Sequence, residues 1–322
     1  MCIRDRYLQS TCETAGAYPA FANAVDSNGH EIAYTYQFAN PVTPDGGLPD
    51  GDTTVPVTLS RAWTTSTATQ TITATGLPAT PDRPRVGSPS LSFAYAEVAE
   101  GVPLTLQGSP YTTDDAGAVS SAFTMHPGYP DFVQSEVIDT LSLSGGSVFS
   151  LAAGATRSAP SATSQVTSLG LSTLPLFTKS SASAGANDAG APSRPVVTWT
   201  STGSLSAAAG IVAQVQWNTP PVDGGGFVYG AWTILAPSTA TSIVAPALPA
   251  SMSGVSPSAT SSITTTPAVG AIQATFLPSY AVLRSKFGIL PIFSTSGSVN
   301  LNLPPLPVNG TLFVTAIFQN QT

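Results

Sequence analysis

Charged side chains are scarce in this sequence of 322 residues, and most of them lie in the first 140 residues. They make up 8% of the chain, against about 25% in an average soluble protein. Residues 141–322 contain no histidine and seven charged side chains, namely Arg157, Lys179, Asp188, Arg194, Asp223, Arg284 and Lys286. Acid–base, metal and phosphate chemistry depends on such groups, so we predict that the protein is not an enzyme.

Basic residues, cysteines and long apolar runs are also few. Ten Lys and Arg residues against 17 Asp and Glu give a net charge of −7. That balance offers no phosphate-binding stripe, so we expect no nucleic-acid partner. Cys2 and Cys12 are too few to form a disulfide framework. No apolar run reaches the roughly 18 residues of a membrane helix, so this fragment predicts no transmembrane span.

The first six residues, Met-Cys-Ile-Arg-Asp-Arg, resemble a peptide translated from sequencing-adapter or assembly read-through in metagenomic data. We therefore leave residues 1–6 out of the fold prediction. We therefore expect that the true N-terminus, with any secretion signal or lipobox, is missing from this fragment.

The residues that are abundant predict β-structure. Val, Ile, Thr and aromatic residues recur with a period of two, as in residues 31–38, where Ile, Tyr, Tyr and Phe alternate with smaller or polar residues. The 29 prolines argue against long helices. Residues 132–143 fit either a long strand or a short helix, and their Val, Ile and Thr content favours a strand. The four tryptophans lie in strand-like contexts and are expected to anchor a core.

Turn signals recur every 8–15 residues or so, which indicates antiparallel sheets. We predict an all-β fold with two antiparallel β-sandwich domains of Ig-like or Greek-key type. An acidic domain would cover residues 7–150 and a low-charge domain residues 195–322. Residues 151–194, rich in Ser, Ala and Gly, predict a linker or long loop between them.

A loop with three carboxylates is the one candidate metal site. Asp45, Asp50 and Asp52 lie within eight residues that also contain three glycines. Calcium binds clustered oxygens on glycine-rich loops, although this spacing is not that of an EF-hand. The two interpretations are a structural Ca²⁺ site and a solvated acidic turn, and no other cofactor is predicted.

Glu97 and Glu100 form the best carboxylate pair for glycoside chemistry, but their directions diverge at a strand end. Asp131 and Glu136 could converge with them in space, and His126 lies in a turn that follows residue 125. No Gly-x-Ser-x-Gly motif accompanies the many serines. We therefore predict no catalytic residues and leave the convergence of these side chains for the structure to decide.

Several motifs in the C-terminal part carry a family resemblance, namely residues 197–200, 210–212, 232–237 and 243–249. Residues 195–320, and less closely 24–78, resemble uncharacterised secreted or lipoprotein-type proteins of Gram-negative bacteria. Those proteins are thought to consist of carboxypeptidase-regulatory-like or Ig-like β-sandwich modules. The resemblance implies a location outside the cell and a modular architecture, and it brings no catalytic motif.

Three functions are compatible with the sequence. The first is a secreted or cell-surface, non-enzymatic protein with a structural, adhesive or binding role, whose partners would be surface glycans or other surface proteins. The second is a virion or phage structural subunit, because such subunits also use low-charge sandwiches. The third is a carbohydrate-active protein, which would need convergent carboxylates in a cleft.

Overall fold

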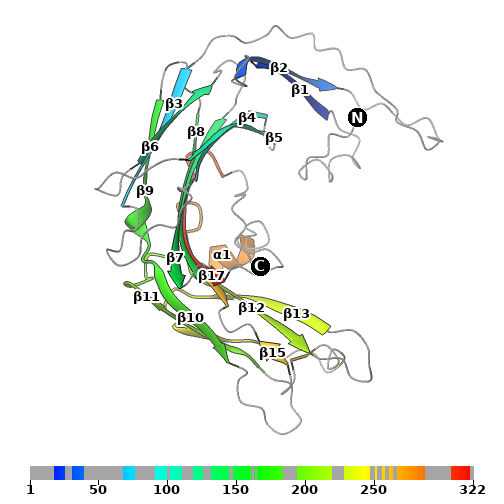
Figure 1. Ribbon diagram of the computed structural model, residues 1–322, viewed down its shortest axis with the longest axis vertical. Coiled ribbons are helices and arrows are strands. Elements are labelled where there is room, and N and C mark those ends of the chain that lie inside the picture. Colours follow the sequence, from blue (N-terminus) through cyan, green and yellow to red (C-terminus); the bar gives the residue numbers. More distant parts are fainter. Residues whose placement is uncertain are drawn as a thin grey trace, which may run out of the picture.

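The structure is a computed structural model in which most of the described residues are β-strand (Figure 1). The predicted all-β class and antiparallel sheets are therefore confirmed. The residues that the structure describes are 18–25, 31–39, 68–76, 91–99, 102–110, 119–125, 132–144, 148–159, 161, 163, 165–183, 194–219, 228–246, 251, 256–257, 261–263, 267–286 and 306–319.

A curved antiparallel sheet of nine strands runs through the molecule (Figure 1). A short strand, β15 (Ser262–Ile263), pairs with β12 beside the main path. The order of the other strands is β13 (Val228–Ala236), β12 (Gly210–Thr219), β16 (Ala268–Ala274), β17 (Thr311–Gln319), β8 (Val148–Ser158), β7 (Phe132–Ser144), β4 (Leu91–Ala99) and β5 (Val102–Pro110).

Two three-stranded sheets and a hairpin accompany the large sheet. The first small sheet has the order β6 (Val119–Met125), β3 (Ala68–Thr75) and β9 (Gln165–Gly170), and its β3–β9 pair is parallel. The second has the order β10 (Phe177–Ser183), β11 (Val196–Ser201) and β14 (Ser242–Val244). The hairpin joins β1 (Tyr18–Val25) to β2 (Glu31–Ala39), and the 3₁₀ turn η1 (Leu171–Thr173) connects β9 to β10.

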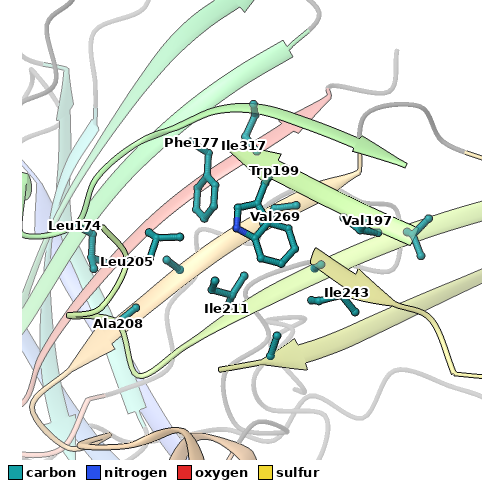
Figure 2. Close-up of a cluster of buried hydrophobic side chains, with 14 residues drawn as sticks. Leu174, Phe177, Val197, Trp199, Leu205, Ala208, Ile211, Ile243, Val269 and Ile317 are labelled. Carbon is teal, nitrogen blue, oxygen red and sulfur yellow. The ribbon is translucent and has the colours of Figure 1, made fainter. Parts of the chain in front are cut away.

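Both small sheets pack on the same face of the large sheet, which we call the outer face (Figure 1). Figure 2 shows the larger of the two cores, where Phe177 and Trp199 from the small sheet meet Ile211 and Val269 from the large one. The second core joins Ile72 of β3 and residues of β9 and η1 to Val137 of β7. Because successive side chains point to opposite faces of a strand, every second side chain is directed toward the core.

The opposite face, which we call the inner face, is covered by the helix α1 (Tyr280–Lys286) and by the chain around Leu306. Pro278 and Ser279 precede the helix, and the Ser279 hydroxyl accepts a hydrogen bond from the Val282 N–H at 3.4 Å, as a cap does. The apolar contacts here join residues of the helix, β16, β17 and the 306 segment: Ile272, Leu283, Leu306, Leu312 and Val314. Seven residues are too few to show a helical period in the sequence.

Residues 151–194, predicted to be a linker or long loop, contain strands over much of the part that the structure describes. They form most of β8 and all of β9 and β10. Strand β8 also joins the two predicted domains, because it pairs with β7 on one side and with β17 on the other. The large sheet is thus continuous across the predicted boundary, and a division into two Ig-like sandwiches is not confirmed.

Two finer predictions agree with the structure. Residues 132–144 form a strand, β7, rather than a helix. Trp199 and Trp217 are buried, and Trp232 packs beside Trp217 with ring centroids 4.1 Å apart. These three rings therefore anchor the core, as their strand contexts predict, whereas the fourth tryptophan, Trp63, lies outside the described residues.

Candidate functional site

Most of the side chains that the sequence singled out lie outside the described residues. These are Asp45, Asp50 and Asp52 of the calcium candidate, and Glu100, His126 and Asp131. Within the described ranges, no group of three or more His, Cys, Asp or Glu residues could hold a metal ion. The calcium site therefore stays a prediction.

Glu97 and Glu136 lie on neighbouring strands, β4 and β7, of the large sheet. The register places Glu97 opposite Phe132, four residues along β7 from Glu136. At a rise of about 3.3 Å per residue, their backbone positions are roughly 13 Å apart along the strands. Paired carboxyl groups in glycosidases lie about 5–10 Å apart. The register thus gives no support to a glycosidase pair made of these two residues.

Three buried polar side chains form a cluster on the inner face of β7 and β8: Gln134, Glu136 and Arg157. The register pairs Gln134 with Arg157, and Glu136 follows two residues along β7 on the same face. The Gln134 Nε2 group donates to Glu136 Oε1 at 2.7 Å. The Gln134 Oε1 atom accepts from the Leu306 N–H at 2.8 Å. We call this group the inner polar cluster.

Glu136 is the titrating member of the inner polar cluster. Its side chain is 0% exposed, and Oε2 has no hydrogen-bond partner among the described residues. Desolvation by burial raises the pKa of Glu136 from 4.5 to about 7, although the Gln134 hydrogen bond opposes this. Near neutral pH the carboxyl group therefore exchanges between its protonated and ionised forms.

Arg157 holds the chain segment that covers the cluster. Its Nη1 group donates to the Leu306 carbonyl, and its guanidinium lies 4.3 Å from the centroid of the Phe132 ring. The Arg157 backbone N–H donates to Gly310 at 3.1 Å, and its carbonyl accepts from the Asn309 N–H at 2.9 Å. Asn309 adopts a left-handed φ of 58° in this turn. Arg157 thus fixes residues 306–310 to β8, together with Thr156, whose hydroxyl donates to the Gly310 carbonyl at 3.1 Å.

Replacing Arg157 with methionine is expected to lower the free energy of unfolding by about 2 kcal/mol, because it removes a charge-assisted hydrogen bond and a cation–π contact. Methionine keeps the apolar volume, so the loss reports the polar contacts. Urea unfolding measures this change, and proteolysis should cut first near residues 306–310. Lys286→Met, at an exposed position on α1, is the control and should change stability by less than about 0.5 kcal/mol. Equal effects of the two substitutions would contradict the role of Arg157.

A second set of buried polar residues lies between the sheets on the outer face. The Gln70 Nε2 group donates to Thr167 Oγ1 at 2.8 Å and to Ser135 Oγ at 3.3 Å. Asp139 also lies on this face, so β7 directs it away from Glu136. These contacts tie the small sheet to the large one, which is a structural role.

The chemistry of the inner polar cluster is limited to proton binding. It contains one carboxyl group, and the side chains of Glu136 and Arg157 are 0% and 5% exposed. A substrate would need access that this burial denies. Sequence reasoning named Glu136 only as a side chain that could converge with Glu97, Glu100 and Asp131. The sequence of β7 gives no local signal for its burial, because alternation places Gln134 and Glu136 together on one face.

Outward-facing hydroxyl groups form an exposed polar surface on each of the two small sheets. On the second small sheet, Thr178 Oγ1 lies 2.8 Å from Thr200 Oγ1, and Ser181 Oγ lies 2.8 Å from Thr198 Oγ1. The one charged side chain on this surface is that of Lys179, within the described residues. We call this surface the β10–β11 hydroxyl face.

A similar surface covers the first small sheet. Thr69, Thr71, Thr73 and Thr75 follow one another on the outward side of β3 at every second position. Thr73 Oγ1 lies 2.8 Å from Ser168 Oγ on β9. Because both small sheets cover the outer face of the large sheet, the two hydroxyl surfaces lie on one side of the molecule (Figure 1).

Comparisons with known proteins do not assign the chain to a family. No family model, curated protein or solved structure matches it. In the part of the chain that the structure describes, no helix is long and apolar enough to cross a membrane.

Proposed function

We propose that the protein is a secreted or cell-surface, non-enzymatic protein that binds surface glycans or other surface proteins. The observation that carries this proposal is the pair of hydroxyl surfaces on the two small sheets. Hydroxyl groups in a fixed array recognise sugar hydroxyls and polar protein surfaces through many hydrogen bonds, each of modest strength.

The hydroxyl pairs are suited to this role because they are fixed before a partner arrives. Each threonine or serine hydroxyl has one donor and two acceptor positions, so a pair such as Thr178 with Thr200 still has acceptors for a ligand. Side chains that already bond one another lose less conformational entropy on binding. The near absence of charge makes such contacts insensitive to salt.

Each small sheet, together with the part of the large sheet beneath it, resembles the two-layer modules of surface proteins. Each small sheet packs on the large sheet as a two-layer arrangement with its own apolar core. Membership of the carboxypeptidase-regulatory-like or Ig-like class, with an extracellular or lipid-anchored location, is part of the proposal. The long shared sheet supports a rigid, extended binding surface rather than two independent modules.

Removing hydroxyls from the β10–β11 hydroxyl face tests the proposal. The triple variant Thr178→Val, Thr198→Val and Thr200→Val keeps side-chain shape and removes three hydroxyls. At about 1 kcal/mol for each lost hydrogen bond, affinity should fall roughly a hundredfold. Co-sedimentation with peptidoglycan sacculi, cellulose and chitin, together with binding to intact cells, measures the effect.

Thr239→Val provides the control, because Thr239 is exposed in the turn between β13 and β14 and belongs to neither β10 nor β11. It should bind as the unchanged protein does. Binding that the triple variant retains in full would contradict the assignment of this face. Absence of binding to every one of these surfaces would contradict the proposed function itself.

A second candidate function, a virion or phage structural subunit, is favoured by one specific observation. The large sheet ends in a regular strand without charge or proline, β13, which suits assembly through strand pairing. Electron micrographs of concentrated protein should then show particles or rings, and dispersed small species would count against this candidate.

A further inference from the structure

The two edges of the large sheet differ in how they are protected against pairing with another strand. The edge strand β5 contains Pro103 and Pro110, and its pairing with β4 has two register irregularities. Prolines and bulges are the usual means by which proteins block edge pairing. This edge is therefore protected.

The other edge strand, β13, has none of these protections. Its nine residues, VYGAWTILA, include no charge and no proline, and its pairing with β12 is regular throughout. Among the described residues, no strand pairs with its outer side. Tyr229, with 73% of its surface exposed, adds a large aromatic ring at this edge. A strand of this kind is a template for another strand.

We propose that the outer edge of β13 pairs with β13 of a second copy of this chain, about a two-fold axis, so that the large sheets of the two copies become continuous. An antiparallel edge is self-complementary, because a two-fold rotation presents the same donors and acceptors to each other. Neither copy carries a charge in this strand that would repel the other. This inference does not depend on glycan binding.

The position of the axis follows from a contact at the end of β13. The Tyr280 hydroxyl of α1 donates to the Leu235 carbonyl at 3.0 Å. This bond occupies the last part of the edge, so a partner strand would lie along residues 228–234. The midpoint of that stretch is Ala231, which places Ala231 opposite Ala231 of the second copy.

An axis at Ala231 would bring aromatic rings of the two copies together. This register places Trp232 of one copy opposite Gly230 of the other, twice. The space over Gly230 is occupied by Trp217 of the same chain, because a Cβ at Gly230 would lie 2.0 Å from Trp217 Cζ2. Trp232 of the second copy would therefore pack beside Trp217, which already contacts Trp232 of its own chain. Aromatic pairs across neighbouring strands stabilise a sheet.

Sedimentation velocity tests this proposal by measuring dimerisation of the full chain from 1 to 200 µM. The test variant is Ala231→Lys. The unchanged protein should dimerise, and Ala231→Lys should raise the dissociation constant at least about tenfold, because two like charges would face each other. Mixing Ala231→Lys with Ala231→Glu in equal amounts should restore the dimer. Thr239→Lys adds the same charge in a turn and should leave dimerisation unchanged.

Several results would overturn the proposal. They are a monomer at all concentrations, a dimer that Ala231→Lys leaves intact, and charge variants that fail to recombine. Open filaments would indicate head-to-tail pairing of different edges rather than a two-fold dimer. Circular dichroism in the far ultraviolet must show that Ala231→Lys is folded. The near-ultraviolet tryptophan signal should change with concentration in the unchanged protein and stay constant in the variant.

Discussion

Replacing Glu136 with glutamine is expected to stabilise the protein at pH 8 by on the order of 3 kcal/mol relative to the unchanged chain. The folded protein holds the Glu136 proton up to about pH 7, whereas the unfolded chain releases it near pH 4.5. Ionisation therefore favours the unfolded state. The stabilising contribution of the protonated carboxyl is complete below about pH 4.5 and is lost as pH rises through about 7. Glutamine stays neutral and can still accept from Gln134.

The measurement is urea unfolding of both proteins from pH 4 to pH 8, and the relevant quantity is the difference between their free energies of unfolding. Other carboxyl groups titrate in both proteins alike, so their contributions cancel in this difference. The difference should grow by on the order of 3 kcal/mol between pH 4.5 and 7 and then level off. Ser135→Ala, a buried neutral change on the same strand, should shift stability equally at every pH. A difference that does not vary with pH would show that Glu136 has an ordinary pKa in the folded state.

The strands themselves follow from local sequence signals. Period-two alternation and β-branched residues are sufficient to place strands such as β2, β7 and β12, and the buried tryptophans follow from the same pattern. What joins the strands into one sheet is not local. Leu312 of β17 lies opposite Ala155 of β8, more than 150 positions away along the chain. No composition or period marks such a pairing, so the predicted domain boundary fell inside a continuous sheet.

The inner polar cluster could not be predicted for the same reason. Alternation in β7 places Gln134 and Glu136 on one face, which a local reading assigns to solvent. In the structure that face is covered by Leu306, whose N–H bonds to Gln134 and whose carbonyl bonds to Arg157. Burial of the carboxyl group, and hence its raised pKa, thus depends on a segment 170 residues further along the chain. The hydroxyl surfaces have no distinctive sequence signal, because Ser and Thr are common throughout.

The small residues of β8 explain why residues 151–194 resembled a linker. Ala152, Ala153, Gly154 and Ala155 are all buried, with sheet layers or covering segments on both faces of the strand. Small side chains let these layers approach closely, and Gly154 marks the closest approach. A Cβ at Gly154 would lie 2.6 Å from Leu171 Cδ2 and 3.2 Å from the Phe313 ring. Low side-chain volume here is a packing requirement rather than a sign of flexibility.

Replacing Gly154 with valine is therefore expected to lower the free energy of unfolding by about 3 kcal/mol, at the upper end of overpacking costs. Both obstructing side chains are held in place, since Leu171 is the buried residue of η1 and Phe313 packs against both cores. Gly170→Val is the matched control. A Cβ at Gly170 meets nothing within 4 Å, and its φ of −95° suits any residue. Valine there should be neutral or slightly stabilising, because it restricts the unfolded chain.

A double substitution separates close packing from other causes of instability. Leu171→Ala alone should cost about 2–5 kcal/mol through the cavity that it creates. In combination with Gly154→Val, the new methyl groups would occupy part of that cavity. The double variant should therefore lose less free energy of unfolding than the two single variants lose in sum. A coupling of about 1 kcal/mol or more in urea unfolding would place the two residues in direct contact. Strictly additive losses would mean that valine acts through something other than Leu171, and that the small residues of β8 are not there to bring the two layers together.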